Sequence, residues 1–364
     1  METNQRIFGL DLIRVTAIVM ILMAQCIWIL PQSGSAVVTQ VASLFHFMGL
    51  EIFFVLSGFL LGNSMYKLLM KDDFGSHSVL HFLKKRAIRI LPLYYLVLAI
   101  NFGIARHIGY PVEQGWKYIV LLQNFASPIP AFFSESWGLP IIVFDGVLFP
   151  LVLLGFNAIF KPKNKSGLFF IVALFLIAIF LISKFIYNAT TPNTDVNQWY
   201  ADLKPVVIYR LDAVIIGILF SWLLNNIAFF RKSRLLLAFI GGVGIGFIFV
   251  GVGYFQLLIE SHPFFWNVIY LPMASLSIAF FLPLLCAWKN SFAATPIRFL
   301  SAITYAVYMV HFGIVLQLMK FYFPVAVPKQ WLLFVISYLT ITFILGFLLN
   351  RLCQKIFIKR LPAQ

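Results

Sequence analysis

The chain has 364 residues, of which 62% are hydrophobic and only 11% are charged, and its mean hydropathy is +0.95. A soluble domain carries about 25% charged residues, so this composition excludes a soluble globular protein and indicates a polytopic membrane protein. The net charge of +15 does not indicate nucleic-acid binding, because the basic residues lie between apolar runs. The three cysteines fall in separate runs without a Cys-x-x-Cys spacing, which predicts no disulfide and no metal–thiolate site.

The apolar runs predict an all-α integral membrane protein, because crossing a bilayer takes about 20 apolar residues. We expect a single membrane-embedded domain over residues 1–364 with no appended soluble domain. The predicted spans are ten: 8–30, 44–66, 87–106, 138–160, 167–187, 205–225, 234–257, 266–288, 298–320 and 331–352. A cleaved signal peptide is an alternative for the first run. Asp11 and Arg14 inside that run, and its length, argue against it.

The loops between these spans alternate in charge. Nineteen basic residues fall on one side of the membrane, including Arg6 and the cluster from Lys84 to Arg89. The other side has six: Arg106, Lys117, Lys184, Lys204, Lys320 and Lys329. Because Lys and Arg concentrate in cytoplasmic loops, this asymmetry predicts that both termini are cytoplasmic.

The first span carries polar residues at two depths. Asp11 and Arg14 lie near its start, and Gln25 follows Arg14 by eleven positions. Eleven residues make about three helical turns, so Arg14 and Gln25 share one helix face roughly 16 Å apart along the axis. Charges inside a span are costly and mark functional sites by default. A purely structural i,i+3 pair between Asp11 and Arg14 is the alternative.

Other spans also carry polar residues. We expect Glu51 to partner a buried base, and Asp145, Arg210 and Asp212 to form an ion-pair network. His311, in the stretch YMVHFGI, is expected to be a hydrogen-bonded core residue.

The stretch KKRAIRILPLYY at 84–95 is basic and amphipathic. It can anchor the chain to anionic lipid, at about 1 kcal/mol per basic residue. It can equally bind a phosphate-bearing cytosolic ligand, because Arg86 and Arg89 at i,i+3 project together and can hold phosphate bidentately. Both interpretations stay open on the residues alone.

Several stretches together resemble one family, the acyltransferase 3 family of bacterial integral-membrane O-acyltransferases. The resemblance runs in order along essentially the whole chain. Its stretches are LDLIRVTAIVMILMAQ at 10–25, EIFFVLSGFLLG at 51–62, FLKKRAIRILPLYY at 82–95, FFSESWGL at 132–139, YRLDAVIIG at 209–217 and ITYAVYMVH at 303–311.

The resemblance implies a multi-pass protein of the bacterial inner membrane. It would move an acyl group, for which acetyl is expected, from cytosolic acyl-CoA to a hydroxyl of a cell-surface glycan or lipid-linked saccharide at the outer face. The implied catalytic positions are Arg14, oriented by Asp11, the position of Gln25, and Glu135. The acyl-CoA donor would be held by Lys85, Arg86, Arg89 and Tyr94, and no metal is implied.

Position 25 departs from the family, whose first span has a histidine eleven residues after the arginine. Histidine can accept a proton near neutral pH, whereas a glutamine amide cannot. Three explanations are open: an engineered His-to-Gln substitution, a natural branch that lost catalysis, or another base. His46 is our candidate for such a base, and an interfacial hydrogen-bonding role is its alternative. We expect this chain to be catalytically impaired.

Two other function classes remain. A transporter or flippase would also carry intramembrane charges, although the chain lacks the internal repeats common in secondary transporters. A non-catalytic binding member of the same fold would explain a natural Gln25. The acceptor, the acyl length and the oligomeric state are not readable from the sequence.

Overall fold

The computed structural model describes residues 6–29, 36–191, 195–323 and 330–358, which contain helices and no β-strand. This confirms the predicted all-α class. Nine helices in these ranges are long and apolar enough to cross a membrane. They are Phe8–Ile27, Val38–Leu69, Ser76–Ile108, Ser134–Phe160, Lys165–Thr190, Arg234–Tyr254, Phe265–Ala287, Ala294–Tyr322 and Trp331–Phe357.

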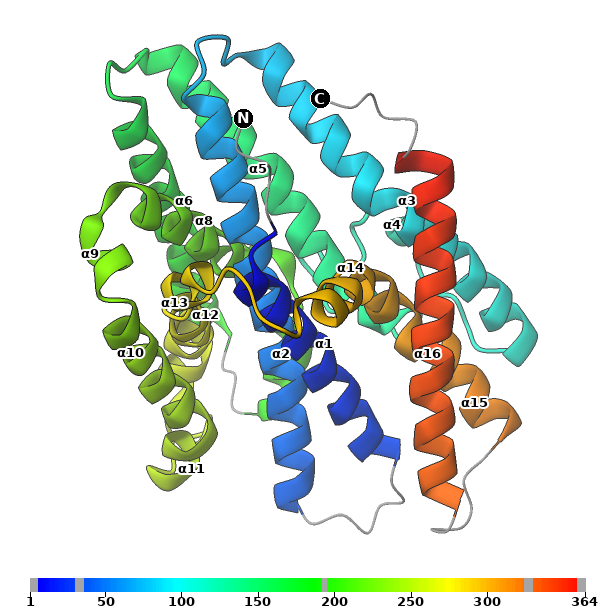
Figure 1. Cartoon of the computed structure of the whole chain (residues 1–364). Helices are drawn as coiled ribbons and strands as arrows, with labels where there is room; N and C mark the ends of the chain where they lie inside the picture. Colours follow the sequence, from blue (N-terminus) through cyan, green and yellow to red (C-terminus); the bar gives the residue numbers. More distant parts are fainter. Residues whose placement is uncertain (1–5, 30–35, 192–194, 324–329, 359–364) are drawn as a thin grey trace.

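The helices pack side by side into one bundle (Figure 1). Its α-helices are α1 (Phe8–Ile29), α2 (Ala36–Leu69), α3 (Ser76–Ile108), α4 (Gly115–Ile119), α5 (Gly138–Phe160), α6 (Lys165–Thr190), α7 (Val196–Asp202), α8 (Leu211–Asn226), α9 (Ala228–Lys232), α10 (Arg234–Gly246), α11 (Val252–Tyr254), α12 (Leu271–Ala279), α13 (Leu282–Ala287), α14 (Ala294–Val310), α15 (Gln317–Tyr322) and α16 (Trp331–Cys353). Short 3₁₀ turns form η1 (Ser134–Trp137) and η2 (Val207–Tyr209). Wider π-helical turns form η3 (Phe247–Gly251), η4 (Phe265–Tyr270), η5 (His311–Leu316) and η7 (Gln354–Ile358).

The predicted span 205–225 is shorter than expected. Its helix, α8, begins at Leu211 and has 16 residues, or about 24 Å at 1.5 Å per residue. The segment before it enters the bundle as the 3₁₀ turn η2. Irregular backbone is tolerated at membrane depth where protein surrounds it, and Arg210, at the junction, is fully buried.

Two helices begin well before their predicted spans. The second starts at Ala36 instead of residue 44, and α3 starts at Ser76 instead of residue 87. Consequently, the basic cluster 84–89 lies on a helix and not in a loop. A helix can extend beyond the bilayer and keep its backbone hydrogen bonds. The length of an apolar run therefore does not determine where the helix starts.

Helices α2 and α8 pack against each other at the centre of the bundle. Their backbones approach closely at two glycines: a Cβ on Gly58 would overlap the carbonyl of Val214, and one on Gly217 would overlap that of Val55. Small residues permit such contact between membrane helices. This contact holds together the helices that carry the buried residues Glu51 and Asp212.

The basic loops after α2 and α5 lie at the upper end of the bundle in Figure 1, and the end of α8 contacts α2. The hydroxyl of Tyr66 donates to Asn226 over 2.8 Å, and the Lys165 ammonium donates to the carbonyl of Lys71 over 3.0 Å. This grouping agrees with the predicted common side for these loops. Their cytoplasmic orientation stays a prediction.

Candidate functional site

Two cavities, each of about 310 Å³, lie within the bundle and have no lining residue in common. The first cavity is lined by Arg14, Leu50, Phe53, Phe54, Leu56, Ser57, Leu60, Arg86, Ile90, Gly138, Leu139, Ile142, Thr304, Tyr305, Tyr308 and Met309. The second cavity is lined by Gln25, His46, Pro128, Ile129, Ser134, Glu135, Trp137, Tyr200, Ala201, Lys204, Pro205 and Phe312. The face shared by Arg14 and Gln25 on α1 therefore contributes to both.

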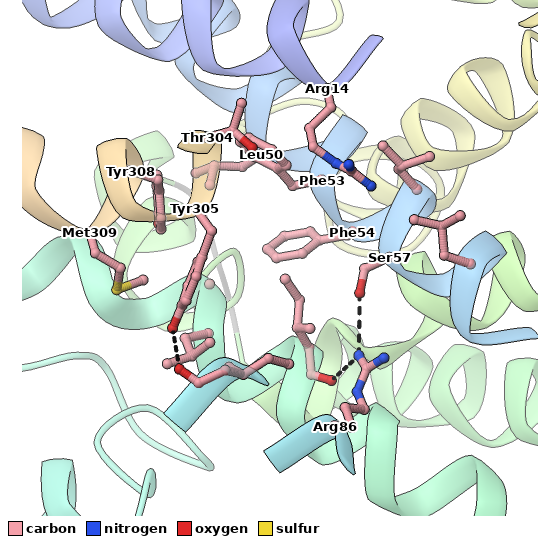
Figure 2. A pocket seen from close by; sticks show the side chains of 16 residues that line it. Arg14, Leu50, Phe53, Phe54, Ser57, Arg86, Thr304, Tyr305, Tyr308 and Met309 are labelled. Atoms are coloured by element: carbon pink, nitrogen blue, oxygen red, sulfur yellow. Dashed lines mark hydrogen bonds between the residues drawn. The ribbon is translucent and has the colours of Figure 1, made fainter. Parts of the chain in front are cut away.

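The first cavity is apolar between two cationic groups. Figure 2 shows Arg14, from α1, and Arg86, from α3, on its opposite sides, with Phe53 and Phe54 between them. Such a space suits an elongated ligand with an apolar middle and polar ends.

A polar network holds the Arg14 guanidinium. Arg14 Nη1 donates to Ser301 Oγ over 3.0 Å, and that hydroxyl donates to Asp11 Oδ1 over 2.6 Å. The same carboxylate oxygen lies 3.6 Å from Arg14 Nη1 and 2.8 Å from Arg6 Nη2. Asp11 is thus placed to orient Arg14, as predicted, and it does so together with Ser301 on α14.

Arg86 is held against α5. Its Nη2 donates to the carbonyl of Ile142 at 3.3 Å and to Ser57 Oγ at 3.4 Å, while its Nε has no partner. A Cβ on Gly146 would lie 2.5 Å from that Nε, so only glycine leaves room for the guanidinium. The neighbouring Asp145 is buried, and neither of its oxygens has a hydrogen-bond partner.

A smaller cavity of about 220 Å³, which we call the basic cavity, adjoins the first. Lys85, Arg86 and Arg89 all line it, and it shares Leu60, Arg86 and Ile90 with the first cavity. The structure therefore brings together three of the four residues predicted for the donor.

Tyr94, the fourth, is not part of this group. Its side chain is fully buried, and its hydroxyl donates to the carbonyl of Tyr118 over 2.7 Å. It lines neither the first cavity nor the basic cavity. Tyr94 follows Arg86 by eight residues, or about 12 Å along the helix axis, so we assign it a packing role.

Glu135 reaches the second cavity from the short turn η1. The preceding Phe133 has φ = 47°, a left-handed conformation that is uncommon for a residue other than glycine. Glu135 Oε1 accepts the backbone N–H of Gly313 over 2.5 Å, and the Tyr308 hydroxyl donates to the Glu135 carbonyl over 2.5 Å. Its other oxygen, Oε2, is buried without a partner. The carboxylate thus keeps one acceptor atom available.

The predicted residues Gln25 and His46 also line the second cavity. Gln25 is 4% exposed, and its Oε1 has no hydrogen-bond partner. His46 is half-buried on α2. The structure therefore assembles the three candidates Gln25, His46 and Glu135 around one space.

Sequence reasoning missed Lys204, which we had counted as an outward loop charge. Its side chain is 7% exposed and lines the second cavity. Burial lowers the pKa of its ammonium to about 7. The adjacent Trp199 and Tyr200, which carry the aromatic packing of this segment, were the available signal.

The remaining intramembrane charges form two buried pairs. Glu51 binds Arg210 and accepts the Ser275 hydroxyl over 2.8 Å, which confirms that Glu51 partners a base. Lys184, a second residue we had placed in the outward set, is fully buried and pairs with Asp212. In the expected network, Asp212 interacts electrostatically with both Arg210 and Asp145. The direct ion pairs of this network are made with two further residues, since Arg210 binds Glu51 and Asp212 binds Lys184.

His311 lies between the two cavities. It is fully buried, its Nδ1 is 2.5 Å from the Tyr308 carbonyl, and its Nε2 has no partner. Tyr308 lines the first cavity, and Phe312, one turn later, lines the second. Likewise, Gly138 lines the first cavity, and its chain neighbour Trp137 lines the second. The two cavities therefore meet at neighbouring residues of the same segments. Within the described ranges, no cluster of three or more His, Cys, Asp or Glu residues has the arrangement of a metal site.

Neither the curated proteins nor the solved structures provide a match to this chain. A family model described as an acyltransferase domain matches residues 7–351, which is nearly the whole chain and includes every lining residue of both cavities. The chain therefore belongs to the acyltransferase 3 family of membrane acyltransferases.

Proposed function

We propose that the chain transfers an acyl group, with acetyl as the expected one, from cytosolic acyl-CoA to a hydroxyl of a glycan or lipid-linked saccharide at the outer face of the bacterial inner membrane. The observation that carries this proposal is the arrangement of α1. Arg14 lines a cavity that adjoins the basic cavity, and Gln25, on the same helix face, lines a separate cavity that contains a carboxylate.

The donor side follows from charge and shape. The phosphates of acyl-CoA would bind Lys85, Arg86 and Arg89 in the basic cavity, since Arg and Lys are the usual phosphate ligands. The acyl-pantetheine arm would run through the first cavity past Phe53 and Phe54. The acyl end would extend past Arg14 to the boundary between the two cavities, where Gly138 lines the first and Trp137 the second. There the thioester would meet the acceptor, and the cation of Arg14 would favour the negative charge of the departing thiolate.

The acceptor side is the second cavity. Trp137 and Tyr200 offer aromatic surfaces there, and Glu135 offers a free carboxylate oxygen to a sugar hydroxyl. Gln25 occupies the position at which the family resemblance expects the histidine base. Since its amide cannot take a proton near neutral pH, we expect slower turnover than in a relative with histidine.

The test is direct binding of acetyl-CoA to the purified protein in nanodiscs. We expect Arg86→Ala combined with Arg89→Ala to weaken binding at least about tenfold, because each lost charge-assisted hydrogen bond contributes about 1.5–3 kcal/mol. The matched control is Lys161→Ala with Lys232→Ala, which removes two exposed positive charges outside the basic cavity.

Two outcomes argue against the proposal. Binding unchanged by the Arg86 and Arg89 substitutions would remove the donor site. Membranes that contain the protein should also move the label of [14C]acetyl-CoA into an alkali-labile ester of the polysaccharide or lipid fraction. Binding of acetyl-CoA without any such ester would instead indicate a non-catalytic member of the family.

A further inference from the structure

Lys204 lines the second cavity, to which the proposed function assigns the acceptor. Its Nζ is 4.4 Å from the centroid of the Tyr200 ring and 5.4 Å from that of Phe47. The side chain is only 7% exposed. In the part of the chain that the structure describes, no carboxylate forms an ion pair with it. Two aromatic rings are modest compensation for a buried ammonium, so the site favours the neutral amine.

Two carboxylates lie nearest to Lys204 in the sequence or in the cavity, and neither forms an ion pair with it among the described residues. Glu135 lines the same cavity; its Oε1 accepts the Gly313 N–H, and its Oε2 has no hydrogen-bond partner. Asp202, two residues before Lys204, is half-buried and interacts electrostatically with Tyr187.

Other titratable groups around this end of the cavity belong to three elements. They are His46 on α2, Tyr200 on α7 and His311 on η5. Burial raises the pKa of Tyr200, so its phenol stays protonated and offers no negative charge to Lys204. With the lysine pKa at about 7, the amine and the ammonium are both populated near neutral pH.

We propose that Lys204 is the general base of this chain: its neutral amine removes the proton of the acceptor hydroxyl in the second cavity. The inference rests on the proposed acyl transfer and identifies the group that takes the place of a histidine at position 25. A buried lysine is suited to this role because desolvation makes it a base at neutral pH. Gln25 retains a hydrogen-bonding function, since its unpartnered Oε1 can accept from the same acceptor molecule.

The step balances without another reactant. The acceptor O–H bond breaks and its proton forms an N–H bond on Lys204, while the oxygen forms a bond to the thioester carbonyl carbon. The C–S bond then breaks, and the coenzyme leaves as a thiolate towards the cation of Arg14. The Lys204 ammonium returns its proton to water in the open cavity, which restores the amine.

The first test compares two substitutions that differ in charge. Lys204→Met removes the amine, and Lys204→Arg keeps a positive charge that cannot be given up at neutral pH. Both should reduce ester formation from [14C]acetyl-CoA at least about 100-fold, within the range of general-base contributions, and leave acetyl-CoA binding unchanged. Lys320→Met, at an exposed lysine on α15, should retain full transfer.

The outcomes separate the base from its alternatives. Full transfer by Lys204→Arg would overturn the proposal in favour of a purely electrostatic role, and full transfer by Lys204→Met would remove any role. If His46→Gln abolishes transfer while Lys204→Met does not, the base is His46. If the wild-type chain binds acetyl-CoA but forms no ester, the proposed acyl transfer is wrong, and so is the assignment of Lys204 as its base.

A second measurement uses the wild-type protein and no acyltransferase assay. The rate of acetic anhydride labelling at each lysine is measured by mass spectrometry as a function of pH. Lys204 should titrate near pH 7, well below the ordinary lysine value of about 10.4. Titration of Lys204 at the ordinary lysine value would overturn the proposal, and this result would not depend on whether the variants fold.

Discussion

The guanidinium of Arg14 and the hydroxyl of Ser301 are joined by a 3.0 Å hydrogen bond that links the first helix to α14. Because Ser301 also donates to Asp11 over 2.6 Å, the hydroxyl transmits the position of the carboxylate to the arginine. The direct contact between Arg14 and Asp11 is longer, at 3.6 Å. Ser301 is therefore a positioning residue for the cation that faces the first cavity.

We expect Ser301→Ala to weaken acetyl-CoA binding about tenfold, because a hydrogen bond to a charged group contributes about 1.5–3 kcal/mol. Binding in nanodiscs measures this change. The control is Ser261→Ala, which removes an exposed hydroxyl that lines neither the first cavity nor the basic cavity. Wild-type affinity in Ser301→Ala would mean that Asp11 alone positions Arg14.

The pair of Glu51 and Arg210 gives a prediction on stability. Both side chains are fully buried, on α2 and at the start of α8. Removal of one partner leaves an uncompensated buried charge, which costs about 3–5 kcal/mol. We therefore expect Glu51→Gln to lower the melting temperature of the purified protein substantially, whereas Glu113→Gln, at an exposed residue, should not.

A double substitution separates the pair from its surroundings. Glu51→Leu with Arg210→Met removes both charges, and we expect it to be more stable than either single variant. Additive losses of stability would show that the two charges act independently.

Gly313 sets the position of Glu135. A Cβ on this glycine would overlap both Glu135 Oε1 and Asn101 Oδ1, and the Gly313 N–H is the donor that holds the carboxylate. We expect Gly313→Ala to displace Glu135 and to reduce ester formation at least about tenfold, since a displacement of about 1 Å in a reacting group can cost 10²-fold. Acetyl-CoA binding in the separate first cavity should persist.

The control for this variant is Gly155→Ala, whose added Cβ meets nothing within 4 Å. Ester formation by Gly313→Ala at the wild-type rate would indicate that Glu135 is not needed at its observed position.

Hydropathy predicted the helical class and the approximate spans because lipid imposes a length and an apolar composition on each helix. It failed at α8, whose surroundings are protein, and at α2 and α3, which extend beyond the apolar runs. Charge counting treated Lys184 and Lys204 as loop residues. Both are buried by contacts with distant segments, the first by Asp212 and the second by Phe47.

The candidate site was predicted better where spacing on one helix decides the geometry. Arg14 and Gln25 face separate cavities, as eleven residues of helix imply, and Arg86 and Arg89 line one cavity at i,i+3. Ser301 and Gly313 could not be found in this way, because their roles depend on how α14 and η5 pack against α1 and η1. Local periodicity carries no information on such pairings between remote segments.

The lowered pKa of Lys204 also predicts how stability depends on pH. An unfolded lysine has a pKa of about 10.4, against about 7 in the folded chain. Between these values the unfolded chain binds one more proton, so the unfolding free energy rises with pH by up to about 1.4 kcal/mol per unit from this residue. Below pH 7 both states are protonated, and its contribution no longer changes.

Melting temperatures of the wild type and Lys204→Met, measured from pH 6 to pH 10, check this dependence. The advantage of the methionine variant over the wild type should be greatest below pH 7 and should shrink as the pH rises to 10. A difference that stays constant over this window would mean that Lys204 titrates as an ordinary lysine.

The substitution Gln25→His tests the acceptor side of the mechanism. An imidazole at this position would place a second base, with an ordinary pKa near 6.5, in the cavity that already contains Lys204 and Glu135. We expect ester formation from [14C]acetyl-CoA to rise about tenfold or more at neutral pH. Gln25→Asn, which keeps an amide, should give no such gain.

The two bases should also be coupled. In the Gln25→His background, Lys204→Met should cost much less activity than it does in the wild type, because the imidazole can then take the proton in its place. Equal losses in the two backgrounds would mean that Lys204 and position 25 act on different steps. A Gln25→His variant no more active than the wild type would show that position 25 is not a site from which a base can reach the acceptor hydroxyl.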